Sequence, residues 1–255
     1  ICDYDKKKKI KLKKKNKNIK YFQNSNYLIN NKDIDLVSIA SYDDDHYTQI
    51  IECIKNKKNI FVEKPICLKE DQLYKIKKLI KKENIKIDSN FVLRQTEIFK
   101  NLKKIIKKEK KTLYHIEADY LWGRYQKLFG WRNRAKDYSL ILGGAIHMID
   151  LVCWLLEDFP IKVYTVGNKI ALKKEKFKKE SFILMLLQFR NKLTVKISVN
   201  SCSQSKHFHD LKIFTKNKSI YHSPLNSVIF KNQKQKKLIG LYPDKKNRKN
   251  QKIYF

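Results

Sequence analysis

The stretch Ile60-Phe61-Val62-Glu63-Lys64-Pro65 joins the pattern of a buried strand to charged residues at the point where the strand ends. β-branched and aromatic residues favour a strand. A carboxylate and an ammonium are costly at its buried end unless something there uses them. Ligands of open α/β sheets bind outside the carboxyl ends of the strands, and Pro65 favours extended backbone at Lys64. The sequence therefore predicts a ligand site at residues 63–65, with an exposed surface ion pair as the alternative.

The residues around this stretch predict a parallel sheet. Residues 34–40 form a second, nearly continuous apolar run, as expected for a strand covered on both faces. Between the two strands, residues 47–54 carry apolar side chains at helical spacing. Three aspartates at 43–45 precede this helix, where they would cap it, with a metal site as the alternative. A second helix with its apolar side at 73–80 leads to a third predicted strand over 85–91.

Beyond residue 96 the strand–helix alternation gives way to one helix and then to strand-rich sequence. A helical stripe over 98–106 precedes a predicted strand over 112–122. The longest apolar run, 139–156, contains His147 and Asp150, so we interpret it as a buried helix at an active site rather than a membrane span. The following runs are predicted to form an antiparallel sheet: 162–166, 182–189, 193–199 and 211–214.

Two blocks of this sequence resemble a known enzyme family. The segment 35–65, with His46 at the helix start and Glu63-Lys64-Pro65 at the strand end, is similar to the glucose–fructose oxidoreductase and inositol dehydrogenase family, Gfo/Idh/MocA. A second block agrees: GWR at 130–132, followed by GGAIHMIDL at 143–151. Either block alone is weak evidence, but together, in the family's order and separation, they are strong.

The resemblance implies an α/β fold in two domains. We expect a Rossmann-type NAD(P)-binding domain with a parallel sheet at 1–93, then a substrate-binding α+β domain with a largely antiparallel open sheet at 94–255. None of the six glycines precedes Gly123, whereas a Rossmann fold opens with a G-x-G-x-x-G turn. We therefore expect the first βα unit to be missing, and the carboxyl end at Tyr254-Phe255 to be incomplete as well.

The resemblance also implies an activity: hydride transfer between NAD or NADP, with NAD favoured, and a hydroxyl of a sugar, cyclitol or nucleotide sugar. Lys64 would hydrogen-bond the reacting hydroxyl and stabilise negative charge on its oxygen. His147 would take the proton. On a helix, Asp150 lies on the same side as His147 and would orient it.

Further contacts are implied at both ends of this site. An acid at Asp3, with Asp5 as second choice, would bind the adenosine ribose. The remaining residues are expected to contact the two ligands as follows: Ser41, His46, Glu63, Lys64 and Pro65 the cofactor; Trp131, Arg132 and Asp150 the substrate.

One departure from the family concerns the proton chemistry. Many members carry an aspartate four residues before the histidine, and this chain has Gly143 there. A branch resembling surface-polysaccharide sugar dehydrogenases shares the Gly-Gly-x-x-His-x-x-Asp form, which favours retained activity. The alternative is a catalytically silent member of the same fold that binds cofactor or sugar.

The charge balance raises a second alternative, a basic nucleic-acid-binding protein. Lys and Arg number 58 against 25 acids, which gives a formal net charge of +33. The lysines are spread through the whole sequence, however, and arginine, the residue suited to bidentate phosphate recognition, is scarce. We therefore predict no specific nucleic-acid partner.

The cysteines indicate the compartment. The chain has five, an odd number without C-x-x-C spacing, which predicts neither a disulfide framework nor a metal cluster and favours a reducing cytoplasm. The partners expected are thus a small polyol or sugar and, by resemblance, further copies of the chain bound through the carboxyl-terminal sheet, with no membrane.

Overall fold

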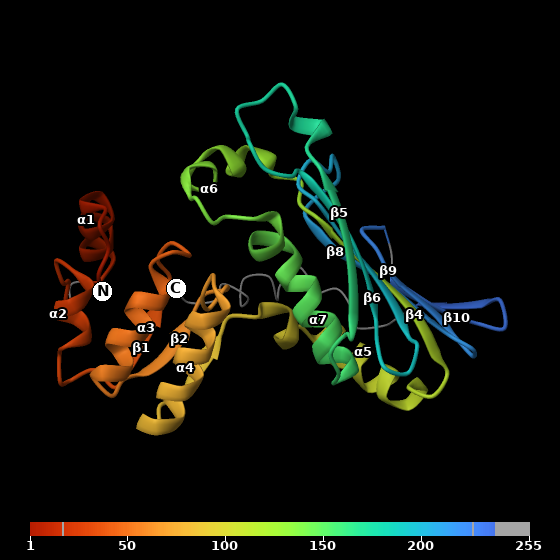
Figure 1. Cartoon of the computed structure of the whole chain (residues 1–255), viewed down its shortest axis with the longest axis horizontal. Helices are drawn as coiled ribbons and strands as arrows, with labels where there is room; N and C mark the ends of the chain where they lie inside the picture. The colour runs from red at the N-terminus through yellow and green to blue at the C-terminus, as the bar shows by residue number, and fades with distance from the viewer. Residues whose placement is uncertain (17, 226, 238–255) are drawn as a thin grey trace. The chain divides into compact units, whose positions relative to one another are not determined.

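A computed structural model describes residues 1–16, 18–225 and 227–237 and divides the chain into two compact units (Figure 1). The first unit comprises Ile1–Asn90, and the second begins at Phe91. The expectation about Tyr254 and Phe255 lies outside the described residues.

The first unit is built on a parallel sheet, as predicted. Its strands are ordered β1 (Leu36–Ile39), β2 (Asn59–Val62) and β3 (Ile87–Ser89). Helix α3 (His46–Lys55) follows β1, and α4 (Glu70–Glu83) follows β2. The apolar side of α3 packs on β1 and β2, because its isoleucines recur at helical spacing. This arrangement brings the carboxyl ends of β1 and β2 to one edge of the sheet.

The amino-terminal segment contains two helices that the sequence did not predict, α1 (Lys6–Lys15) and α2 (Ser25–Ile29). The sequence of α1, KKKKIKLKKK, has almost no apolar stripe to reveal it. Its N-cap is Asp5, whose carboxylate accepts a hydrogen bond from the Lys7 backbone N–H at 2.9 Å. Asp5, the second choice for the ribose site, therefore has a structural role here.

Aspartates 43–45 were predicted to cap α3. For Asp45, the residue at the N-cap position, capping by the side chain was a wrong prediction. Asp45 occupies the N-cap position but makes no side-chain capping hydrogen bond. The backbone closes the turn instead: the N–H of Asp45 donates to the carbonyl of Tyr42 at 3.0 Å. Among the described residues, no group of three or more His, Cys, Asp or Glu side chains is arranged to hold a metal ion.

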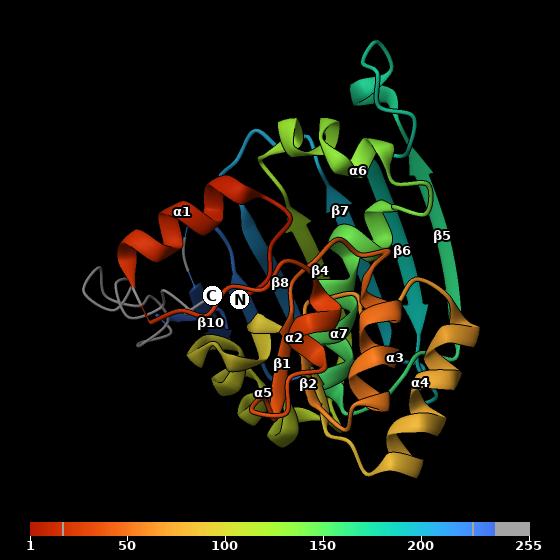
Figure 2. The same ribbon diagram turned by 90° about the vertical axis from the view of Figure 1, so that its left-hand side faces the viewer.

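The second unit contains an eight-stranded sheet in the order β11-β10-β9-β8-β4-β7-β6-β5 (Figure 2). Its neighbouring strands pair antiparallel, except for β4 and β7, which are parallel. The prediction of a largely antiparallel sheet is confirmed, and this one parallel pair corrects its detail. The strands are β4 (Leu113–Leu121), β5 (Lys162–Asn168), β6 (Phe182–Gln188), β7 (Thr194–Asn200), β8 (Phe208–Thr215), β9 (Ser219–His222), β10 (Ser227–Lys231) and β11 (Lys234–Lys237).

Two longer helices, α5 (Glu97–Glu109) and α7 (Ile146–Leu156), lie along one face of this sheet (Figure 1). They share its core, in which Leu102, Leu151 and Ile116 are fully buried. The buried helix predicted over 139–156 is thus observed as α7, preceded by a π-helical turn, η3 (Ile141–Ala145). The shorter helices are η1 (Val92–Gln95), η2 (Tyr125–Phe129), α6 (Trp131–Arg134) and η4 (Ile170–Leu172). Across the described ranges, every helix is too short or too polar to cross a membrane.

Candidate functional site

In the first unit, His46 joins the loops that follow β1 and β2. Its side chain is fully buried, at 0% exposure. Its Nδ1 lies 2.7 Å from the carbonyl oxygen of Pro65, and its Nε2 lies 3.3 Å from that of Ser41. The hydroxyl of Ser41 donates to Oε1 of Gln49 on α3 at 2.8 Å. The backbone on the carboxyl side of Lys64 is therefore tied to the start of α3.

The backbone on the amino side of Lys64 is tied to the loop after β3. Nδ2 of Asn90 donates to Oε1 of Glu63 at 2.7 Å, and the N–H of Asn90 donates to the carbonyl of Val62 at 2.9 Å. The peptide bond between Lys64 and Pro65 is cis. Lys64 thus lies between two residues that are each held by hydrogen bonds, which restricts the backbone at Lys64.

These contacts change the interpretation of His46. The resemblance implied that this residue contacts the cofactor, and that expectation stays a prediction. Both ring nitrogens face backbone carbonyls inside the protein, so the side chain is suited to hold the two loops in place. The described contacts therefore favour a positioning role for His46.

Asp3, the predicted ribose residue, presents a charged carboxylate. It accepts hydrogen bonds from Nζ of Lys8 at 2.8 Å and from the backbone N–H of Asp5 at 2.9 Å. Burial raises the pKa of Asp3, but Lys8 and the Asp5 N–H lower it more, so the pKa lies below its ordinary value. An ionised acceptor fits ribose hydroxyls, while the adjacent ammonium of Lys8 would also suit a 2′-phosphate, so these residues fit NAD and NADP alike.

In the second unit, His147 belongs to a group of four rings. Tyr120, near the end of β4, has its ring centroid 5.8 Å from that of His147, 5.2 Å from His207 and 5.0 Å from His209. Tyr120 is only 6% exposed and stands opposite His209 in the β4–β8 register. We call Tyr120, His147, His207 and His209 the ring cluster.

Burial dominates the protonation of Tyr120, His207 and His209 in the ring cluster. It lowers the pKa of His207 to about 4, with help from Arg124 and Lys127, and lowers the pKa of His209 well below its ordinary value. Burial also raises the pKa of Tyr120 to about 12. At neutral pH, His207, His209 and Tyr120 are therefore uncharged.

Two glycines allow tyrosine rings to pack against the helix segment before His147. A Cβ on Gly144 would lie 3.2 Å from the ring of Tyr120. A Cβ on Gly143 would lie 2.3 Å from the hydroxyl oxygen of Tyr138, closer than real Cβ contacts allow. The space that an aspartate at position 143 would use is thus filled by Tyr138, which gives a packing reason for the departure from the family.

Asp150 is paired with an arginine. Its carboxylate accepts from Nε of Arg94 at 2.8 Å and also from a terminal guanidinium nitrogen of the same residue. Burial of the carboxylate, 9% exposed, raises the pKa of Asp150, and Arg94 opposes that rise. The pair joins α7 to η1, so the carboxylate predicted to orient His147 or contact substrate is engaged with Arg94.

The two predicted substrate contacts before α7 stack on each other. The guanidinium carbon of Arg132 lies 4.6 Å from the ring centroid of Trp131 and 5.5 Å from that of Trp122. Arg132 also lowers the pKa of Tyr120 against the effect of burial, which places its charge near the ring cluster. Contact of Trp131 and Arg132 with a substrate stays a prediction.

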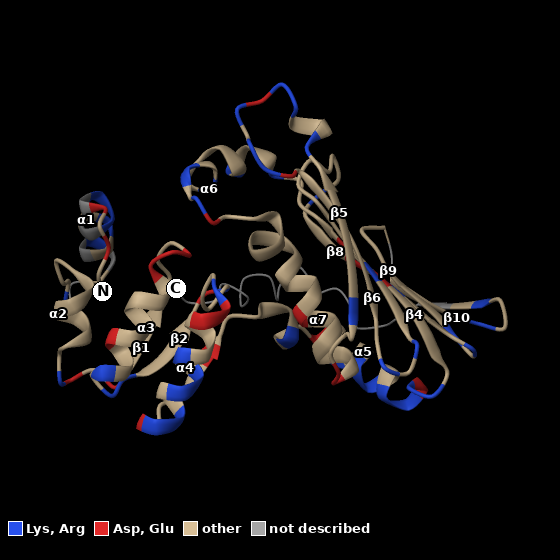
Figure 3. Cartoon of the chain, in the orientation of Figure 1, with Lys and Arg blue, Asp and Glu red and all other residues tan. Residues whose placement is uncertain are grey.

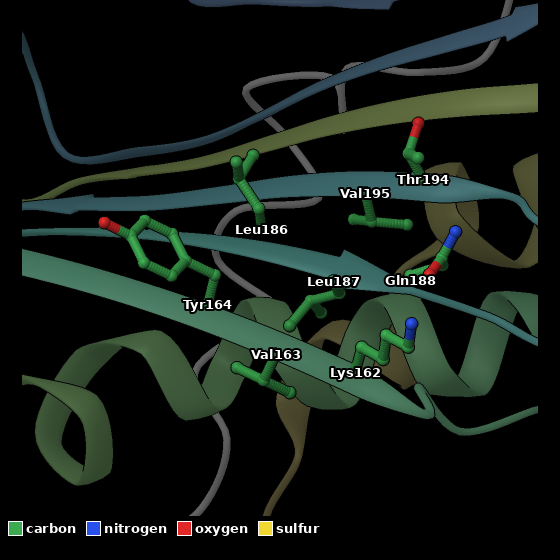
Figure 4. A pocket seen from close by; sticks show the side chains of 8 residues that line it. All are labelled: Lys162, Val163, Tyr164, Leu186, Leu187, Gln188, Thr194 and Val195. Atoms are coloured by element: carbon green, nitrogen blue, oxygen red, sulfur yellow. The ribbon is translucent and has the colours of Figure 1, made fainter.

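A separate hollow of about 400 Å³ lies on strands β5, β6 and β7 (Figure 4). Its lining is mainly apolar and contains none of the candidate site residues. The lining residues are Lys162, Val163, Tyr164, Leu186, Leu187, Gln188, Thr194 and Val195.

Sequence reasoning missed His207, His209 and Asn90. The sequence did contain a signal for the two histidines. Residues 207 and 209 are two positions apart at the start of a strand, so their side chains lie on the same face of the sheet. For Asn90 we find no local signal, since its partner Glu63 is 27 residues away.

Comparison with known proteins identifies the family of the chain. Residues 1–91 match the model described as "Oxidoreductase family, NAD-binding Rossmann fold", and residues 103–238 match "Oxidoreductase family, C-terminal alpha/beta domain". The chain belongs to the Gfo/Idh/MocA oxidoreductase family. This confirms the predicted family and fold.

Curated relatives are distant and longer. The chain is 26% identical over 167 residues to 2,7-anhydro-N-acetylneuraminate hydratase of Escherichia coli, covering 64% of this chain and 44% of that protein. It is 24% identical over 168 residues to an uncharacterized oxidoreductase of Streptococcus pneumoniae, covering 65% and 46%. The match thus spans less than half the length of these two relatives.

Solved structures show the same fold at low identity. Myo-inositol 2-dehydrogenase from Lactobacillus plantarum is similar with a TM-score of 0.82 and 18% identity, over 92% of this chain and 72% of that one. Scyllo-inositol dehydrogenase from Lactobacillus casei, solved with NAD(H) and scyllo-inositol, has a TM-score of 0.79 with the same identity and coverage.

Proposed function

We propose that this chain acts in an NAD(P)-dependent oxidoreductase that moves a hydride between the cofactor and a CH–OH group of a sugar, cyclitol or nucleotide sugar. The observation that carries the proposal is Lys64, held at the sheet edge by the His46 and Asn90 contacts on either side. The inositol dehydrogenases among the solved neighbours support a polyol substrate.

Each residue then has a stated role. When bound, the nicotinamide carries the hydride. Lys64 donates a hydrogen bond to the reacting hydroxyl and stabilises the negative charge that develops on its oxygen. His147 takes the hydroxyl proton. Asp3 would hold the adenosine ribose, and the loop at Ser41 would line the same edge of the sheet.

A panel of polyols and sugars, assayed for NADH and NADPH formation, tests this proposal. We expect Lys64→Met to lower turnover by about a hundredfold, as removal of an electrostatic stabiliser does. The matched control is Lys55→Met, because Lys55 is an exposed lysine of the same unit paired with Glu52. Near wild-type turnover in Lys64→Met would remove Lys64 from the mechanism.

Binding measurements beside this assay separate the alternative functions. Cofactor or sugar binding without turnover, for every substrate of the panel, would support a catalytically silent member. Lys and Arg occur on helices of both units (Figure 3), so we expect any DNA binding to be weak and to disappear as salt is added. Nanomolar, sequence-selective binding at physiological salt would instead favour a nucleic-acid function.

We also propose self-association through the sheet of the second unit. Strands β5 and β6 expose apolar side chains there, including Tyr164 at 65% and Leu186 at 49%. Sedimentation of Leu186→Lys beside the wild type tests this: a lower molar mass for the variant supports it, and a monomeric wild type contradicts it.

A further inference from the structure

The ring cluster lies on one face of the sheet, and the acids next to it in the sequence point to the opposite face. Side chains alternate along a strand, so Tyr120 and His209 share one face, and Asp119 and Asp210, also paired in register, share the other. The charges acting on Asp210 are those of that second face, with Asp119 and Lys212 foremost. The strands β4 and β8 thus present rings on one side and carboxylates on the other.

The charged groups that shift the pKa values of Tyr120, His207 and His209 are basic. In the described part of the chain, those acting on His207 are Arg124, after β4, and Lys127, in η2. The pKa of His209 is lowered by its histidine neighbours, which are His207, His147 of α7 and His222 of β9, and by Arg124. Arg124 and Arg132 of α6 act on Tyr120. These three rings are therefore partly or fully desolvated, and the charged side chains near them, Arg124, Lys127 and Arg132, are positive.

Gly123 brings the loop that carries Arg124 against the segment before β8. A Cβ at this position would lie 2.2 Å from the backbone oxygen of Ser205, so only glycine allows the two loops to approach this closely. His207 follows shortly after Ser205, and its Nδ1 is buried without a hydrogen-bond partner among the described residues. A buried ring nitrogen of this kind costs free energy unless a ligand or water satisfies it.

We propose that Tyr120, His207, His209 and Arg124 bind an acidic group, a carboxylate or a phosphate, carried by the sugar substrate. The inference rests on the proposed function only in taking the substrate to be a sugar or polyol. An anionic oxygen accepts a hydrogen bond from the His207 ring, and the Arg124 guanidinium balances its charge. A neutral hydroxyl could accept the same hydrogen bond but would lack the electrostatic attraction to Arg124.

Binding of an acid here has a proton signature. His207 and His209 are neutral at neutral pH in the free protein. An adjacent anion favours the protonated imidazole and raises its pKa. Complex formation is therefore accompanied by proton uptake in mildly acid solution, between the pKa of the free imidazole and that of the complex, and affinity for an acidic ligand falls as pH rises through this range.

Titration calorimetry of the whole chain with three matched probes tests the proposal: glucose, glucuronate and glucose 6-phosphate. We expect at least one acidic probe to bind about tenfold more tightly than glucose, with proton uptake seen as a dependence of the enthalpy on the buffer. Preference for glucuronate or for the phosphate identifies which acidic group the site takes. Arg124→Gln should abolish the preference, and the control Arg190→Gln, at a turn between β6 and β7, should keep it.

Arg124 is exposed, so its variant does not disturb the core. Equal affinity for glucose and both acids, or an acid preference that survives Arg124→Gln, would overturn the proposal. Acid-selective binding without any NAD(P)-linked turnover would count against the proposed oxidoreductase activity and still support this site.

Discussion

Lys64 shows what a sequence reveals about one residue and what it leaves out. The apolar run before it and the charges beside it predicted a functional strand end. The residues that hold it could not be predicted, because His46 and Pro65 are 19 positions apart, and Glu63 and Asn90 are 27 apart. Such hydrogen bonds depend on tertiary structure and leave no local pattern in the sequence.

His46→Ala separates a positioning role from a cofactor contact. Removing the ring frees the loops at Pro65 and Ser41, so we expect turnover to fall about tenfold through loss of orientation at Lys64. The dissociation constant for NAD(H), measured by fluorescence titration, should stay close to that of the wild type. His46→Gln, which can still donate to one carbonyl, should recover part of the rate. A weakened cofactor affinity at unchanged turnover would show that His46 contacts the cofactor instead.

Gly143 stands where many members of the family have an aspartate, and the packing of Tyr138 against it explains the glycine. Gly143→Ala should destabilise the fold by roughly 1–3 kcal/mol, because its Cβ meets the Tyr138 ring. Urea denaturation measures this. In a Tyr138→Ala background the same substitution should cost clearly less. Equal costs in the two backgrounds would show that the Tyr138 ring is not the obstacle.

Among the elements, most apolar strands and amphipathic helices were predictable, whereas the lysine-rich helix α1 and the short strands at the carboxyl-terminal end of the described chain were not. β1, β2, β4 and β6 follow from their apolar runs. In contrast, α1 lacks an apolar stripe, β9 and β11 are strands of only four residues, and β10 has an apolar run of only three, Val228 to Phe230. Their formation depends on pairing with a neighbour already in the sheet, which no local periodicity reports.

Strand β8 yields a prediction about pH. Burial and the facing Asp119 raise the pKa of Asp210 from 3.8 to about 6. The folded protein therefore holds this proton more tightly than the unfolded chain, and stability falls as pH rises from about 4 to above 6. Asp210→Asn removes this loss, so the variant should be about 1 kcal/mol more stable than wild type at pH 8 and nearly equal to it near pH 4.

Urea midpoints at the two pH values measure this difference, and Asp137→Asn, at an exposed aspartate, is the control. A stability difference for Asp210→Asn that is independent of pH would contradict the raised pKa.

At the scale of the whole molecule, two motif blocks were enough to predict the family and both folds. They could do so because each block combines strand or helix pattern with charged residues that folding alone does not require. Composition was the weaker guide, since the net charge of +33 pointed toward nucleic acid. The ring cluster, assembled from β4, α7 and β8, required the structure.

Isotope transfer tests the central claim most directly. The substrate found in the panel is prepared with deuterium on the carbon that carries the reacting hydroxyl, and the nicotinamide product is examined by mass spectrometry. The account predicts that deuterium appears in the reduced cofactor with the wild-type chain, and that Lys64→Met forms the deuterated cofactor about a hundredfold more slowly. Substrate conversion without deuterium in the cofactor would contradict hydride transfer as the reaction.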